Sequence, residues 1–337
     1  MKNVTLADIA NKTGFSVNTV SHALHDKKDI SAKTKEQIQA VAKEMGYIRN
    51  SSASSLRSGK TKSIAIIVGD ISNPHFSIMI KEMETLFRKK GYTSFILNTD
   101  EDEEMEWTAI TSAISKNVDG IILCPVQKTE GNVRYLMETG IPFTLIGRRF
   151  DQIPTNYVVC DDENGGYLAA SYLLSENHRR ILFLNGGAYI SSAKERLLGI
   201  QRAFVEKGTP LDHLRVVTIP VVNSNQEAAI IQILKENADC TAILCFSDII
   251  AMQVCHGLGR MHVSIPDQVS VVGFDNIAST FSFPMLLSSV TSSKNKVSEE
   301  AVKVLLEMME GRGEVHRQIV LPTKIILRET TKFTGGS

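Results

Sequence analysis

Apolar residues near the start of the chain recur at the spacing of one buried helix face. After Thr5, a residue type that caps helix N-termini, apolar or small residues return at intervals of three and four positions. These positions are Leu6, Ile9, Ala10 and Thr13. Gly14 follows, and glycine readily adopts the left-handed conformation that ends a helix. The pattern predicts a first helix between Thr5 and Gly14.

The next 32 residues repeat this pattern twice, each time after a serine that can act as an N-cap. The stripe after Ser16 consists of Val17, Val20 and Leu24, and the stripe after Ser31 consists of Ile38, Val41, Ala42 and Met45. Gly46 ends the third run. Two short helices joined by a tight turn and supported by a third predict a helix-turn-helix head.

From residue 63 onward the pattern changes to short, nearly continuous apolar runs separated by segments of helical spacing. Such runs are typical of strands that are buried on both faces of a parallel sheet. The predicted strands are 63–70, 93–99, 120–126, 142–147, 157–161, 181–186, 215–220, 242–247 and 269–275, and the predicted helices are 76–90, 102–117, 130–139, 163–176, 192–207, 226–237 and 249–261. The alternation predicts an α/β body made of two similar lobes, each a doubly wound parallel sheet.

Charge is distributed unevenly along a chain whose formal net charge is zero. The first 62 residues carry 11 Lys and Arg against 5 Asp and Glu, whereas the rest carries 26 against 32. A basic head on an acidic body is expected when only one end of a protein meets phosphate groups. We therefore predict that the head binds double-stranded DNA.

Other features of the sequence exclude several classes of protein. The chain begins with charged and polar residues instead of a leader, and its five cysteines show no CxxC spacing, so we expect a cytoplasmic protein with reduced thiols. No metal or cofactor motif is present. The sequence also lacks a Walker loop, an HExxH motif and a GxSxG nucleophile elbow, so we expect no enzymatic activity.

Several short strings resemble the lactose and galactose repressor family of bacterial transcription regulators. They include TLADIA, SVNTVSHAL and MGYIRNSSASSLRSGKTKSIAIIV in the first 68 residues, and DISNPHF, ERLLGI, SDIIAM, IPDQVSVVGFDN and LPTKIILRE further on. The resemblance covers nearly the whole chain. It implies a helix-turn-helix head (1–48), a hinge (49–62) and a two-lobed body like that of periplasmic binding proteins (63–337). It further implies crossings near Cys160, Ser289 and Pro322, which divide the body into 63–160 plus 290–321 and 161–289 plus 322–337.

The predicted DNA contacts lie at the helix starts and on the polar face of the second helix. Asn18, Ser21 and His22 are short polar side chains that can reach base edges in a major groove, although any small helical bundle also carries such residues on its solvated face. The full set in the head is Thr5, Ser16, Val17, Asn18, Thr19, Ser21 and His22.

The segment 49–62 is rich in Ser, Lys and Arg, and composition alone would favour a flexible linker. In the resembled family the matching segment forms a hinge helix whose Leu enters the minor groove. Asn50, Ala53 and Leu56 are the matching DNA contacts here. Arg49 and Ser54 depart from the family pattern, in which a Pro and an Arg stand at these positions.

Ligands of parallel sheets bind beyond the carboxyl ends of the strands, so strand-end residues are candidate effector contacts. The predicted effector site is His75, Phe76, Arg149, Asp161, Asp248 and Asp275, to which the ERLLGI string adds Arg196 by resemblance. Capping would equally explain Asp248, and one of Arg148 and Arg149 would merely pair with an acid. Carboxylates, arginines and one stacking ring together suit an uncharged, hydroxyl-rich molecule.

We predict a DNA-binding regulator that represses a carbohydrate-utilisation operon and responds to a sugar bound between its lobes. By resemblance it would bind a two-fold symmetric operator as a homodimer. A dimer is favoured over a tetramer because no Leu heptads follow LPTKIILRE. Two alternatives remain open at this point. One is a solute-binding protein of a transporter, and the other is a catabolite-control regulator driven by a phosphoprotein corepressor.

Overall fold

The computed structural model describes residues 4–48, 60–222, 226–279, 286–312 and 316–331. The chain divides into two compact units, Met1–Thr61 and Lys62–Ser337, and each is described by itself. The hinge positions Arg49, Asn50, Ala53, Ser54 and Leu56, and with them the predicted minor-groove contacts, lie outside the described residues. Within the described ranges no helix is long and apolar enough to cross a membrane.

The head contains the three helices that the sequence predicts: α1 (Leu6–Thr13), α2 (Val17–Leu24) and α3 (Ala32–Glu44). Thr5, Ser16 and Ser31 cap them, and each side-chain oxygen accepts a hydrogen bond from a backbone N–H of the first turn. The helices enclose a small apolar core of Ile9, Ala10, Val20, Ala23, Ile38 and Ala42. One detail of the stripe predicted after Ser16 is wrong: Val17 is 48% exposed, and Ala23 is buried instead.

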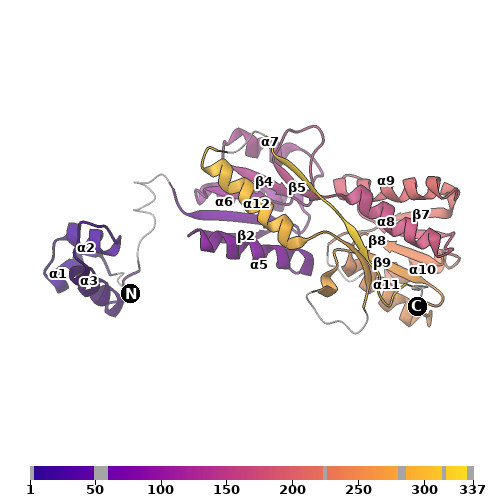
Figure 1. The fold of residues 1–337 in the computed structure, drawn as a ribbon, viewed down its shortest axis with the longest axis horizontal. Coiled ribbons are helices and arrows are strands. Elements are labelled where there is room, and N and C mark those ends of the chain that lie inside the picture. Colours follow the sequence, from indigo (N-terminus) through magenta and orange to yellow (C-terminus); the bar gives the residue numbers. More distant parts are fainter. Residues whose placement is uncertain (1–3, 49–59, 223–225, 280–285, 313–315, 332–337) are drawn as a thin grey trace. The chain divides into compact units, whose positions relative to one another are not determined.

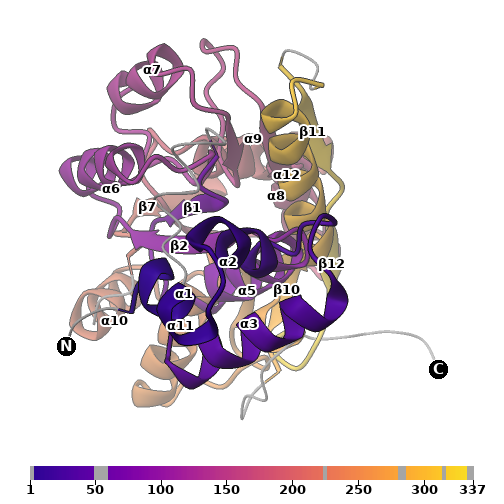
Figure 2. The ribbon, with the colours of Figure 1, turned by 90° about the vertical axis from the view of Figure 1, so that its left-hand side faces the viewer.

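The first lobe is built on a six-stranded sheet in which every neighbouring pair is parallel. Its strands are β1 (Ser63–Val68), β2 (Thr93–Asn98), β3 (Gly120–Leu123), β4 (Phe143–Ile146), β5 (Tyr157–Cys160) and β11 (Gln318–Leu321), in the order β11-β5-β4-β3-β1-β2. Helices α5 (Pro74–Lys89) and α12 (Lys294–Met309) pack on one face, and α6 (Glu103–Ser115) and α7 (Gly131–Glu138) on the other. Figure 2 shows α6 and α7 on the opposite side of β1 and β2 from α12.

The second lobe repeats this plan with one difference at the sheet edge. Its strands are β6 (Ile181–Asn185), β7 (Leu214–Thr218), β8 (Ala242–Cys245), β9 (Ser270–Phe274), β10 (Ser288–Thr291) and β12 (Lys324–Ile326), in the order β12-β10-β9-β8-β6-β7. The edge strand β12 runs antiparallel to β10, whereas the other pairs are parallel. Helices α8 (Asp162–Ser175) and α9 (Ser191–Glu206) cover one face, and α10 (Glu227–Glu236) and α11 (Asp248–Arg260) the other. Within its described residues the lobe also contains two 3-10 turns, Leu211–His213 and Ile277–Ser279.

The chain passes between the two sheets three times, as the strand order shows (Figure 1). β5 and α8 are joined at Asp161, and β11 and β12 are joined by residues 322 and 323. The remaining passage is later than predicted, because Ser289 lies inside β10 of the second sheet and the chain leaves that sheet only after Thr291. The predicted fold class, with its head and two-lobed body of wound sheets, is confirmed.

Candidate functional site

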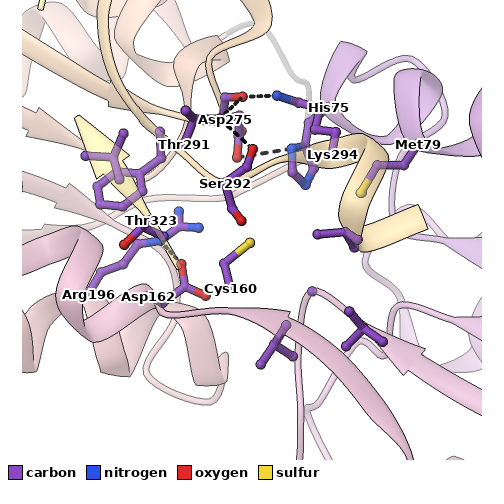
Figure 3. A pocket seen from close by; sticks show the side chains of 16 residues that line it. His75, Met79, Cys160, Asp162, Arg196, Asp275, Thr291, Ser292, Lys294 and Thr323 are labelled. Carbon is purple, nitrogen blue, oxygen red and sulfur yellow. Dashed lines mark hydrogen bonds and ion pairs between the residues drawn. The ribbon is translucent and has the colours of Figure 1, made fainter. Parts of the chain in front are cut away.

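A cleft lies between the two lobes of the body and consists of two adjoining pockets. Including the space open to solvent, the pockets measure about 550 and 510 Å³. They share His75, Gly147, Arg196 and Asp275, so they form one continuous cleft. Figure 3 shows residues of both lobes pointing into the first pocket, among them His75 and Met79 from the first lobe and Arg196 and Asp162 from the second.

Arg196 is held at the centre of the cleft by the second lobe. Its Nε donates to Oδ1 of Asp162 over 2.8 Å, and one terminal nitrogen donates to the carbonyl oxygen of Phe246. The guanidinium carbon lies 4.6 Å from the ring centre of Phe246 and 4.1 Å from that of Phe274. Burial raises the pKa of Asp162, and the hydrogen bond from Arg196 opposes this shift. The arginine is therefore fixed in one orientation.

Close contact between α8 and α9 makes the Arg196–Asp162 pair possible. A Cβ atom on Gly199 would lie 1.8 Å from the carbonyl oxygen of Glu163, so only glycine allows the two backbones to approach this closely. Arg196 lies one helical turn before Gly199 on α9, and Asp162 is the first residue of α8. The small residue on one helix thus brings the charged groups of both helices together.

A second ion pair lies in the second of the two pockets. The two terminal nitrogens of Arg148 donate to the two carboxylate oxygens of Glu101 over 2.7 and 2.8 Å, and both residues are buried. Arg148 also donates to the carbonyl oxygen of Pro125 over 2.9 Å. The aromatic rings of Phe76 and Phe246 line the same pocket. This end of the cleft combines a neutralised cation with two rings that could stack on a ligand.

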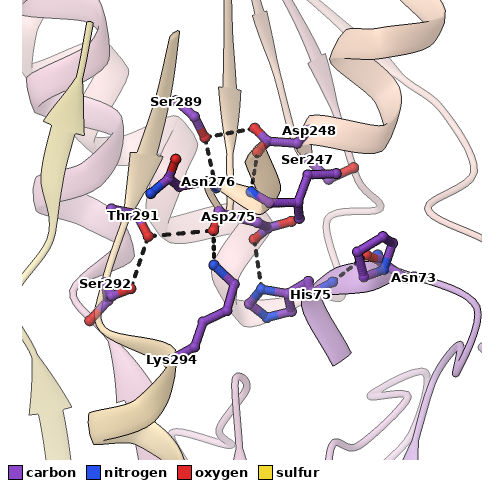
Figure 4. A network of polar contacts seen from close by, with 12 residues as sticks. Asn73, His75, Ser247, Asp248, Asp275, Asn276, Ser289, Thr291, Ser292 and Lys294 are labelled. Carbon is purple, nitrogen blue, oxygen red and sulfur yellow. Dashed lines mark hydrogen bonds and ion pairs between the residues drawn. The ribbon is translucent and has the colours of Figure 1, made fainter. Parts of the chain in front are cut away.

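Asp275 connects the two lobes (Figure 4). Its carboxylate lies 3.3 Å from Nδ1 of His75, a residue of α5 in the first lobe, and its backbone carbonyl accepts a hydrogen bond from Nζ of Lys294. Asp275 has a φ of +102°, a strained conformation for a residue other than glycine. Burial lowers the pKa of His75 to about 4, although Asp275 acts in the opposite direction. Burial likewise lowers the pKa of Lys294.

The structure places Asp248 behind the cleft. Its side chain is fully buried, accepts hydrogen bonds from the Ile277 backbone and the Ser289 hydroxyl over 2.8 and 2.6 Å, and does not line either pocket (Figure 4). Burial raises the pKa of Asp248, and the nearby carboxylate of Asp275 adds to this shift. Asp248 therefore supports the loop that carries Asp275.

Four of the seven predicted effector residues, His75, Phe76, Arg196 and Asp275, line the cleft. Arg149 and Asp161 lie outside the lining, as Asp248 does. Next to Arg149 and Asp161, the neighbouring residues Arg148 and Asp162 line the cleft instead. Arg149 pairs with Glu195 over 2.9 Å and lies 3.5 Å from Asp151, whereas Asp161 caps α8 by accepting from the Asn164 backbone.

Several polar residues of the lining were not among the predicted effector residues. Besides Arg148 and Asp162, they include Glu101, Ser192, Ser247 and Lys294. Ser192 and Ser247 lie at a helix start and a strand end, where the strand-end rule could have found them. Cys124 and Cys160 also line the cleft, and burial raises the pKa of each thiol to about 12, so both are neutral. Among the described residues no cluster of His, Cys, Asp and Glu could hold a metal ion.

In the head, the predicted base-reading residues occupy the outer side of α2. Val17 and Asn18 are exposed, and Thr19, Ser21 and His22 are partly exposed, while Val20 and Ala23 face the core. Thr5 and Ser16 serve as N-caps. Nδ1 of His22 lies 2.6 Å from Oδ2 of Asp29, and this hydrogen bond lowers the pKa of the carboxyl. An ionised carboxylate only accepts, so Nδ1 donates to it.

Comparisons with known proteins agree with both parts of the structure. Residues 5–50 match the bacterial regulatory proteins of the lacI family, and residues 170–331 match the periplasmic binding protein-like domain. The HTH-type transcriptional regulator DegA of Bacillus subtilis (strain 168) is 30% identical over 332 residues, which are 97% of this chain and 98% of DegA.

Two solved structures have a similar fold. The lac repressor dimer bound to operator and the anti-inducer ONPF has a TM-score of 0.84 and 23% identity, over 98% of this chain and 99% of that one. A periplasmic binding protein/LacI transcriptional regulator from Alkaliphilus metalliredigens QYMF, complexed with D-xylulofuranose, has a TM-score of 0.71 and 25% identity, over 81% of this chain and 100% of that one. With a helix-turn-helix head, a two-lobed body and a relative aligned over nearly its whole length, the chain belongs to the lacI family of bacterial DNA-binding transcription regulators.

Proposed function

We propose that this protein is a cytoplasmic repressor that binds a two-fold symmetric operator as a homodimer. The support is the membership in a family of transcription regulators, the helix-turn-helix head and the excess of basic residues at that end of the chain. Each α2 helix would enter a major groove, and the two heads of a dimer would contact the two half-sites. The transporter alternative does not account for the head, and the chain acts by binding rather than by catalysis.

We propose that the effector is a neutral, hydroxyl-rich small molecule, most simply a sugar. The observation that carries this proposal is the charge balance of the described cleft. Arg148 is paired with Glu101 and Arg196 with Asp162, and Nζ of Lys294 donates to the backbone carbonyl of Asp275. A phosphorylated ligand would therefore have to draw Arg148 or Arg196 away from its carboxylate, or rely on Lys294, whose pKa is lowered by burial.

The remaining lining groups suit a sugar. The carboxylate of Asp275 can accept hydroxyl protons, Ser192 and Ser247 can both donate and accept, and the rings of Phe76 and Phe246 can cover the apolar face of a pyranose. The similar regulator solved with D-xylulofuranose is consistent with a ligand of this class. By linkage, such a ligand changes DNA affinity only if it binds the DNA-bound and free forms unequally.

Calorimetry on the full-length protein tests this proposal. We expect at least one neutral sugar of a panel that includes D-xylulose and cellobiose to bind, and sugar phosphates and nucleobases to bind weakly or not at all. Asp275→Asn should abolish sugar binding, because the amide offers one acceptor oxygen in place of the two of the carboxylate and carries no charge. Asp239→Asn, a change at an exposed carboxylate that pairs with Arg180 and Arg215, is the matched control and should bind normally.

Two results would reject the sugar proposal. One is tight binding of a sugar phosphate or nucleobase without binding of any neutral sugar, and the other is normal binding by Asp275→Asn. If a phosphoprotein were the corepressor, replacing the cleft residues would not change DNA binding. Gel-shift titration of operator with the cleft variants therefore separates that alternative from ours.

A further inference from the structure

Helix α9 begins at Ser191, and its first N–H group is satisfied by the opposite lobe. The backbone N–H of Ser191 donates to Oε1 of Gln127 over 2.9 Å, and Gln127 follows β3 in the first lobe. A first-turn N–H has no carbonyl to bond within its own helix, and Ile190, at the N-cap position, offers no side-chain oxygen. The first lobe thus supplies the missing cap of a helix in the second lobe.

Arg149 strengthens this contact from the end of β4. Its backbone N–H donates to the hydroxyl of Ser191 over 3.1 Å, and its guanidinium lies 2.9 Å from the carboxylate of Glu195, one turn along α9. Gln127 is buried and donates from Nε2 to the carbonyl oxygen of Arg149 over 2.7 Å. Gln127, Arg149, Ser191 and Glu195 therefore form one connected docking cluster between the lobes.

The position of this cluster on α9 links it to the cleft. Ser192 and Arg196, which line the cleft, directly follow Ser191 and Glu195 in the sequence. We propose that Gln127 and Arg149 are positioning residues, which dock the start of α9 against the first lobe and so fix Ser192 and Arg196 for the effector. Arg149 thus acts on the effector site through α9 and not by touching the ligand. The part of this inference that concerns the effector rests on the proposed function, whereas the docking itself does not.

Amide hydrogen exchange of the full-length protein, without any sugar, measures the docking directly. The Ser191 N–H is protected through Gln127, so peptides that contain the start of α9 report whether the lobes are in contact. Burial raises the pKa of Glu195 to about 7 although Arg149 acts against it, and pH 8 therefore keeps the carboxylate ionised. The other charged groups near the Arg149–Glu195 pair are Asp151, Asp162 and Arg196. At this pH we expect Arg149→Glu to speed exchange at the start of α9 about tenfold.

A charge swap distinguishes docking from a general loss of structure. Glu195→Arg alone should also speed exchange, and the double variant with Arg149→Glu should restore protection because the pair is rebuilt in reverse. Arg202→Glu is the control on the same helix, since Arg202 pairs with Glu163 within the second lobe, and it should leave the start of α9 unchanged. Gln127→Met, which removes both side-chain hydrogen bonds at similar volume, should speed exchange without any change of charge.

Unchanged exchange in Arg149→Glu or in Gln127→Met would overturn the proposal, and so would a double variant as unprotected as the single ones. None of these results depends on a ligand. If the panel of sugars failed to bind while the charge swap restored protection, the docking would stand and only the proposed effector would fall.

Discussion

Nε of Arg196 lies 2.8 Å from Oδ1 of Asp162, and both side chains are buried between α8 and α9. A buried ion pair of this kind gains little net stability, because both groups give up their hydration. Removing one partner, however, leaves the other charge without compensation in a site of low dielectric constant. The pair thus adds no net charge to the cleft, and Asp162 is costly to replace.

We expect Asp162→Ala to lower the free energy of unfolding by about 3 to 5 kcal/mol, since Arg196 then remains buried and unpaired. The neighbouring change Asp161→Ala removes only the cap of α8 and should cost about 1 kcal/mol. Urea denaturation of the two variants measures both values. Equal losses would show that Asp162 contributes no more than a helix cap.

Most elements of this fold could be predicted from sequence because their signals are local, but α12 and the strands β10, β11 and β12 were not predicted. Thr5, Ser16 and Ser31 cap the helices that they precede, and apolar runs mark the buried strands. The lining of the cleft depends instead on the backbone beyond each strand. Gly147 has a φ of +69°, and after it the chain presents Arg148 to the cleft and Arg149 to the docking cluster.

Contacts between distant segments could not be predicted from the sequence either. Nothing in the sequence indicates that Glu101 meets Arg148, or that Lys294 reaches Asp275 across the passage between the sheets. Asp248 was predicted to bind effector because it follows a strand, yet its carboxylate faces Ile277 and Ser289. Which way a strand-end side chain points is decided by tertiary packing, and a single sequence does not contain that information.

His75 should make the body sensitive to acid. Burial lowers the pKa of His75 to about 4, below its ordinary value of 6.5. As the pH falls from 6.5 to 4, the unfolded chain therefore takes up a proton that the folded chain does not, and stability is lost in this range. We expect His75→Gln to lose less stability between pH 7 and pH 4 than the original protein, as measured by urea denaturation. Parallel pH profiles for the two proteins would exclude this contribution.

Asn18 and His22 should read bases of the operator. Both lie on the outer side of α2, and Asp29 orients the ring of His22. Replacement of either residue by Ala should cost about 1 to 3 kcal/mol on the operator while leaving binding to random DNA nearly unchanged. Gel-shift titration on both DNAs measures this difference, with Gln37→Ala on the exposed side of α3 as the control. Equal losses on operator and random DNA would reject the assignment.

Replacing Gly199 even by alanine should destabilise the body. A Cβ at this position would lie 1.8 Å from the Glu163 carbonyl oxygen and 2.7 Å from the Tyr167 nitrogen, and these backbone atoms can move only if α8 and α9 separate. We expect Gly199→Ala to destabilise the body by about 1 to 3 kcal/mol or more, as overpacked helix contacts do. Separation of the helices would also shift Arg196 away from Asp162, so effector affinity should fall along with stability.

Gly259→Ala in α11 provides the contrast to Gly199→Ala. An added Cβ there meets no atom within 4 Å, and alanine favours a helix over glycine by about 1 kcal/mol. This variant should be slightly more stable than the original protein and should bind effector normally. Thermal unfolding of the two variants gives the comparison directly. If both glycines tolerated alanine equally, the close approach of α8 and α9 would not be what holds Arg196 and Asp162 together, and their pairing would have to depend on the rings of Phe246 and Phe274 instead.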